Sequence, residues 1–289
     1  MRLLLILLPA AAFAHTGEAL QPHDLWTAWS FDPGVVIPMV LAAILYARGA
    51  RRRRGAALRQ IACFWTGWGI LALALVSPLH PLGEALFSAH MIQHEILMLV
   101  AAPLLVLARP LVPMLWGLPA GWRKSVGRWS KSGPVQRTWH AITDPFTAWL
   151  IHAVVLWAWH APPLFQATLR SEAVHAAQHI SFLGSALLFW WSLWYARGRM
   201  GYGAAVLYVF TTAIHTGILG ALLTFTPVAW YPAYASTVSA WGLSLLADQQ
   251  LGGLVMWVPA GVVYTVIGLA LFAGWLRESE AIVERRQFV

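Results

Sequence analysis

Residues 86–107 read LFSAHMIQHEILMLVAAPLLVL, an apolar run interrupted by one acidic side chain and two imidazoles. About twenty predominantly apolar residues suffice to cross the hydrocarbon core of a bilayer as a helix. A membrane strand would need only about ten residues with strict alternation, which this run lacks. The run therefore predicts a transmembrane helix with histidines at one end.

The composition extends this prediction to the whole chain. Of the 289 residues 59% are hydrophobic and 10% charged, with 18 Trp and a mean hydropathy of +0.64. Such a chain is too apolar for an ordinary soluble domain. We expect an all-α integral membrane protein, a bundle of seven transmembrane helices with kinks near Pro103 and Pro259. The expected spans are broadly 33–47, 61–77, 86–107, 146–160, 176–195, 203–225 and 249–275.

The first residues have the form of a secretory leader. Residues 1–14 are short, apolar and end in Ala12-Phe13-Ala14, a small-x-small cleavage pattern. We predict a cleavable signal peptide over 1–14 and a single polytopic membrane domain over 15–289, with His15 freed by cleavage. An uncleaved extra anchor is the alternative, because Arg2 is the only basic residue of the leader.

The basic residues indicate the orientation. Seventeen of the 19 Lys and Arg lie on one side of the expected spans, most of them in the 47–60 and 108–145 connections. By the positive-inside rule that side is cytoplasmic, so the N-terminus lies outside and the C-terminus inside. Topology and anionic lipid explain the net charge of +8, so no nucleic-acid partner is expected.

The pattern His-x-x-Gln-His occurs twice, as His90 to His94 and as His175 to His179. Histidines four apart lie on one helix face and can hold one metal ion together. Both copies begin expected spans that enter the membrane in the same direction, so they can face each other at the same depth. We predict a metal site in the outer half of the bundle, formed by His90, His94, His175 and His179, with His152, His160 and His215 as further candidates. His15, His23 and His80 are placed in outer segments.

Three polar residues accompany these pairs. Gln93 and Gln178 each precede the second histidine of their motif and could orient an imidazole by accepting its free N–H. Hydrogen bonding between helices is the alternative role for both glutamines. Asp248 is the only carboxylate placed like the histidine pairs, at the outer start of the last span, and could neutralise the ion or orient a ligand.

The available ligand atoms favour copper over other ions. The single cysteine, Cys63, falls at the cytoplasmic end of its span, so no thiolate is available outside. Imidazole sites favour copper or zinc, and copper stands highest in the stability order. Met98 and Met256 could offer thioethers to Cu(I), although methionine more often fills gaps in a core. A zinc protease would need His-Glu-x-x-His, and both motifs lack that glutamate, so we expect no enzyme.

Two other functions remain open. A haem-binding electron carrier is the first alternative, because axial histidines in a membrane bundle are common. Two rings on one helix cannot sandwich a macrocycle, however, so haem would leave one histidine of each motif unexplained. A copper transporter is the second alternative. It should have ligands continuing to the cytoplasmic side, where only Cys63 and His140 are found.

Several motifs together resemble a known family. They are the run from His90 through Pro103, the second motif, Trp157-x-Trp-His160, and Asp248-Gln-Gln-Leu-Gly-Gly followed by Met256-Trp. In combination they are similar to the polytopic CtaG family of cytochrome c oxidase assembly factors, over most of the chain from about residue 30 onward. The resemblance implies a seven-span protein of the bacterial plasma membrane that handles copper for a haem-copper oxidase. The implied partners are subunits of that oxidase and a periplasmic copper donor.

Overall fold

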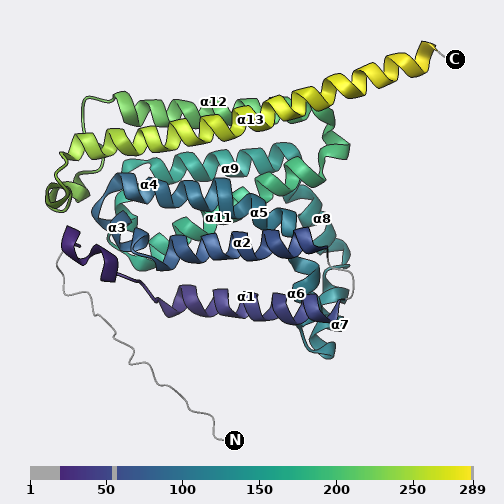
Figure 1. Ribbon diagram of the computed structural model, residues 1–289, viewed down its shortest axis with the longest axis horizontal. Coiled ribbons are helices and arrows are strands. Elements are labelled where there is room, and N and C mark those ends of the chain that lie inside the picture. The colour runs from purple at the N-terminus through teal and green to yellow at the C-terminus, as the bar shows by residue number, and fades with distance from the viewer. Residues whose placement is uncertain (1–19, 54–56, 288–289) are drawn as a thin grey trace, which may run out of the picture.

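A computed structural model describes residues 20–53 and 57–287. The described residues form helices and connections, with no strand among them. The long helices run side by side as a bundle, and the last one extends beyond it (Figure 1). The expected all-α architecture is therefore confirmed. The predicted signal peptide and His15 lie outside the described residues.

The principal rods correspond to the apolar runs of the sequence. They are α1 (Pro33–Arg52), α2 (Leu58–Val76), the stacked segments α4 (Phe87–Glu95), η2 (Ile96–Ala101) and α5 (Ala102–Ala108), and then α9 (Pro145–His160), α11 (Glu172–Tyr195), α12 (Arg197–Phe225) and α13 (Leu245–Gln287). Several begin where the sequence supplies a cap. Asp32 accepts a hydrogen bond from the Gly34 N–H, and Asp144 accepts them from Phe146 and Thr147.

Shorter helices occupy the two ends of the bundle. Next to the start of α4 lie α3 (Leu79–Ala85), α10 (Pro162–Thr168), η3 (Pro232–Ser236) and η4 (Val238–Trp241). At the opposite end lie α6 (Leu111–Gly117), α7 (Ala120–Trp129) and α8 (Gly133–Ile142), as Figure 1 shows. The chain before α1 contains η1 (Pro22–Thr27).

Five helices in the described part of the chain are long and apolar enough to cross a membrane. A sixth arises if α8 and α9, which meet at 66°, form one bent span. The chain is therefore a multi-pass membrane protein. Helix α11, the expected fifth span, is not among the candidates, because His, Gln, Ser and Trp side chains lower its hydropathy. The count of seven spans and the orientation stay predictions.

The irregularity expected near Pro103 takes a specific form. Residues Ile96–Ala101 form a π-helical turn directly after the first histidine motif, and α5 begins with Pro103 in its first turn. Proline has no N–H to donate, and a π turn is one way of adjusting the hydrogen-bond ladder around such a gap. In contrast, α13 continues helically through Pro259.

The core lies among α4, α9, α11, α12 and α13. Phe182, Phe189 and Leu193 of α11 are fully buried in it, as are Phe87 and Met91 of α4. Helix α13 approaches α4 closely, because Gly252 faces Phe87 and a Cβ atom there would collide with the Phe87 ring. This close approach packs α13 against α4, and the glycine contact between Gly220 and Trp257 packs α12 against α13.

Candidate metal centre

Both histidine motifs lie in the first turns of their helices and face each other. Helix α4 begins after Leu86, which is extended, and α11 begins after Ser171, whose hydroxyl accepts from the Val174 N–H. The ring centroids lie 4.3 Å apart for His90 and His94, and 4.4 Å apart for His175 and His179. Across the two helices His90 lies 5.2 Å from His175, and His94 lies 5.4 Å from His179. The four imidazoles thus form one cluster.

A fifth ring joins this cluster from α3. The centroid of His80 lies 5.1 Å from that of His175 and 5.9 Å from that of His179. Sequence reasoning placed His80 in an outer segment but did not assign it as a ligand. The signal that could have found it is weak: a single histidine at the same expected depth, one short helix before the first motif.

The cluster contains two sets of three histidines with ligand geometry. One nitrogen from each of His80, His175 and His179 lies within 4.8 Å of the others, and the same holds for His90, His94 and His179. Imidazole nitrogens at this separation can surround a single transition-metal ion, whose bonds to nitrogen are about 2 Å long. His179 belongs to both sets.

Several nitrogens of the cluster are buried without a hydrogen-bond partner. They are both ring nitrogens of His94 and the Nε2 atoms of His175 and His179. A buried polar atom without a partner costs roughly 1–3 kcal/mol. A cation bound in either ligand set would satisfy one lone pair of each histidine that holds it.

The two glutamines reach across to histidines of other segments. Oε1 of Gln178 lies 3.1 Å from Nε2 of His90, whose Nδ1 lies 3.3 Å from the Gly83 carbonyl oxygen. A neutral imidazole donates through only one nitrogen. If His90 donates through Nε2, Gln178 Oε1 accepts this hydrogen bond and orients the ring, as a residue that supports a metal ligand does.

Gln93 contacts His80. Its amide nitrogen donates to the Ala74 carbonyl at 2.7 Å and lies 3.2 Å from His80 Nδ1. The expectation was that each glutamine would accept an imidazole N–H. The atom of Gln93 nearest the ring is its amide nitrogen, and its Oε1 has no partner. Gln93 therefore connects α4 to the last turn of α2 and to His80.

Asp248 acts on the helix and not on an imidazole. Its carboxylate accepts the backbone N–H groups of Phe87 (2.6 Å) and Ser88 (3.1 Å), as well as the Ser88 hydroxyl. A carboxylate at a helix N-terminus satisfies free N–H donors and interacts favourably with the helix dipole. Asp248 thus sets the start of α4, and with it the depth of His90 and His94.

Tyrosines of the segment between α12 and α13 secure the surrounding backbone. The Tyr234 hydroxyl donates to the Gly83 carbonyl at 2.9 Å, and the Tyr231 hydroxyl donates to the His160 carbonyl at 2.8 Å. Burial raises the pKa of both phenols, so each keeps its proton and remains a donor. This segment therefore fastens α3 and α9 on either side of the cluster.

Residues 44–278 match the family described as cytochrome c oxidase caa3 assembly factor, Caa3_CtaG. The chain belongs to this family. The resemblance noted from the sequence motifs is confirmed.

Relatives of this caa3 assembly factor family member occur in mycobacteria. The chain is 28% identical over 270 residues to the uncharacterized protein Mb0105 of Mycobacterium bovis, covering 90% of this chain and 41% of that protein. It is 27% identical over 287 residues to the uncharacterized protein ML1998 of Mycobacterium leprae, covering 93% and 43%. The chain thus spans about two fifths of the length of these relatives. No solved structure matches it.

The remaining candidate histidines of this caa3 assembly factor family member lie outside the two ligand sets. His160 Nδ1–H donates to the Leu156 carbonyl (2.7 Å), and its Nε2 is buried without a partner. His152 contacts the Ser185 hydroxyl at 3.1 Å. His215 packs edge-on against Trp149, and both of its nitrogens lack partners. His23 is exposed beside Asp24.

The thioethers of Met98 and Met256 are buried in the hydrophobic core. The Oε2 atom of Glu95, next to His94 in the chain, is buried without a partner. Glu95 belongs to neither ligand set among the described residues.

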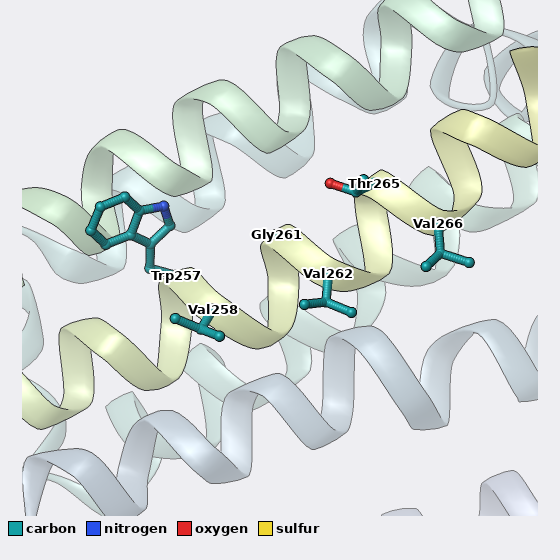
Figure 2. Close-up of a pocket in the computed structure, with 6 residues that line it drawn as sticks. All are labelled: Trp257, Val258, Gly261, Val262, Thr265 and Val266. Atoms are coloured by element: carbon teal, nitrogen blue, oxygen red, sulfur yellow. The ribbon is translucent and has the colours of Figure 1, made fainter.

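A shallow apolar depression lies elsewhere, along α13. Figure 2 shows Trp257, Val258, Gly261, Val262, Thr265 and Val266 lining it. Val258, Val262 and Val266 are exposed, and all six residues lie on a helix that is expected to cross the membrane. The depression therefore fits contact with lipid tails.

Proposed function

We propose that the protein supports the assembly of a haem-copper oxidase by binding copper at the histidine cluster and passing it to an oxidase subunit in the same membrane. The observation that supports this most directly is the convergence of five imidazoles from three helices, with buried ring nitrogens that lack partners. Membership of the caa3 assembly factor family supports an oxidase as the recipient of the copper.

The chemistry of the cluster favours copper. The two ligand sets consist of imidazoles alone, and nitrogen ligands of this kind suit copper and zinc rather than magnesium or calcium. A zinc hydrolase would also need a general base beside the ion. The residues between the paired histidines are Met, Ile and Gln or Ala, Ala and Gln, so a binding role without catalysis fits better.

The arrangement is less suitable for haem. The rings of His90 and His175 are stacked face to face with 19° between their planes, whereas axial ligands of one haem point their nitrogens at the iron from opposite sides. The rings also pack against phenylalanines, with Phe165 5.0 Å from His90 and Phe182 4.5 Å from His94. Little room is left for a macrocycle.

A transporter would need ligands along the whole membrane. Below the cluster the described chain offers His160, His152 and His215, but the last two lie against Ser185 and Trp149 and form no ligand set. We therefore favour uptake and release of copper on one side. In this proposal that side is the periplasm, the protein resides in the plasma membrane with seven spans, and a periplasmic protein donates the copper.

The test combines metal analysis with oxidase activity. Full-length protein and a His94→Ala, His179→Ala double variant are purified from copper-supplied cells, and caa3-type oxidase activity is measured in the same membranes. We expect about one copper per wild-type chain, little in the variant, and reduced oxidase activity. His140→Ala, an exposed histidine of α8, is the matched control and should behave as wild type. Equal copper in wild type and double variant would contradict the proposal.

A further inference from the structure

We propose that the five histidines form two alternative positions for one metal ion. The outer position consists of His80, His175 and His179, and the inner position of His90, His94 and His179. The ion occupies the outer position first and reaches the inner one by exchanging ligands while His179 stays bound. This inference rests on the proposed metal-binding function and adds the order in which the ligands act.

His179 is shared between the two ligand sets. A neutral imidazole has one lone pair for a metal, because its other ring nitrogen carries a proton. The two positions therefore cannot both hold a fully ligated ion, and a single ion passes between them. The two positions are close enough for this exchange. The ring centroid of His179 lies 5.9 Å from that of His80 and 6.1 Å from that of His90.

The exposure of the histidine side chains to solvent decreases from one end of the cluster to the other. The side chain of His80 is 19% exposed. His175 and His179 are 7% and 9% exposed, and His90 and His94 are 0% and 1% exposed. An ion arriving from water therefore meets His80, then the α11 pair, and last the α4 pair.

The two ends of the cluster differ in the residues that surround them. Behind the inner position the His90 and His94 rings pack against Phe165 and Phe182, which offer no ligand. At the outer position Oε1 of Glu84 lies 4.0 Å from Nε2 of His80, and this carboxylate is 48% exposed. A negative charge at the rim raises the local concentration of cations. The Glu84 side is thus the side of arrival.

The experiment uses full-length protein in nanodiscs with Cu(I) as the probe. Uptake is followed after mixing with Cu(I), and release by transfer to a coloured Cu(I) chelator. The variants are His80→Ala and Glu84→Gln at the outer position, His90→Ala at the inner position, and His179→Ala at the shared ligand. His140→Ala serves again as the control, and thermal unfolding verifies that each variant is folded.

The proposal predicts a distinct result for each position. His80→Ala should still bind about one ion at the inner position, with uptake and release slowed roughly 10-fold or more, because the first ligand of the exchange is missing. Glu84→Gln should slow uptake alone. His90→Ala should bind an ion that leaves faster than from wild type. His179→Ala should lose binding at both positions.

The contrary outcomes separate this inference from the proposed function. Wild-type protein without copper would overturn both. Two ions bound together on a wild-type chain, or exchange rates unchanged in folded His80→Ala and Glu84→Gln variants, would overturn the two-position mechanism and leave the copper function standing.

Discussion

Asp248 and Ser88 lie 160 positions apart in the chain and are joined by two hydrogen bonds, from the Ser88 N–H and from its hydroxyl to the same carboxylate oxygen. The other oxygen accepts the Phe87 N–H. Through these contacts the last helix of the bundle determines where the first histidine motif begins. Asp248 is therefore a positioning residue for His90 and His94.

Replacing this carboxylate should weaken the metal site without removing a ligand. Asp248→Ala leaves three buried donors without an acceptor, at a cost of roughly 1–3 kcal/mol each. We expect a lower thermal unfolding temperature and weaker copper binding by purified protein. Asp24→Ala, on an exposed carboxylate of η1, provides the control. Unchanged copper affinity in folded Asp248→Ala protein would show that the start of α4 does not govern the site.

Gln178 should affect metal affinity through His90. Gln178→Leu removes the oxygen that lies 3.1 Å from His90 Nε2, and loss of such a contact typically lowers metal affinity roughly 10- to 100-fold. Competition with a chelator of known affinity measures this change. Gln136→Leu, on an exposed position of α8, should leave affinity as in wild type. Equal affinities in all three proteins would mean that Gln178 serves helix packing alone.

Two glycines of α13 should respond differently to the same methyl group. A Cβ atom at Gly252 would collide with the Phe87 ring, whereas a Cβ atom at Gly261 meets nothing within 4 Å. Overpacking typically costs about 1–3 kcal/mol, so Gly252→Ala should lower stability and copper content. Gly261→Ala should be neutral or slightly stabilising, because alanine favours helix. Thermal unfolding compares the two, and equal stabilities would argue against close contact between α13 and α4.

The orientation can be tested by cysteine labelling in whole cells. In a Cys63→Ala background, Ser239→Cys is placed in the exposed segment next to the histidine cluster and Ser130→Cys between the basic helices α7 and α8. The positive-inside rule puts the basic side in the cytoplasm. A membrane-impermeant maleimide should therefore label Ser239→Cys in intact cells and Ser130→Cys only after lysis. The reverse pattern would invert the topology and place copper uptake in the cytoplasm.

The sequence predicted the features that depend on local pattern. The apolar runs indicated the helices, and the four-residue spacing in each motif put His90 beside His94 and His175 beside His179. The matching position of both motifs at helix starts further indicated that they could meet. These inferences required only helix periodicity and the depth at which each motif enters the membrane.

Long-range contacts could not be read from the sequence. No pattern showed that His80 would stack against His175. His80 lies on the short helix α3, which ends just before α4 begins. Likewise, the position of Asp248 in the sequence indicated only its expected depth in the membrane. That depth is compatible with a role at the metal or at a helix end. Its partners Phe87 and Ser88 are known only once α13 is placed against α4. The number of spans is equally hard to predict, because the polar groups of α11 that line the cluster also lower its hydropathy.

The segment between α12 and α13 has a consequence for binding energy. Tyr231 and Tyr234 fasten it to the backbone of α9 and α3, and Gln249 joins it to α13 by accepting the Trp230 N–H. The imidazoles are thereby held close together by the fold itself. Preorganised ligands lose little conformational entropy on binding, so an arriving cation would have only its own hydration shell to give up.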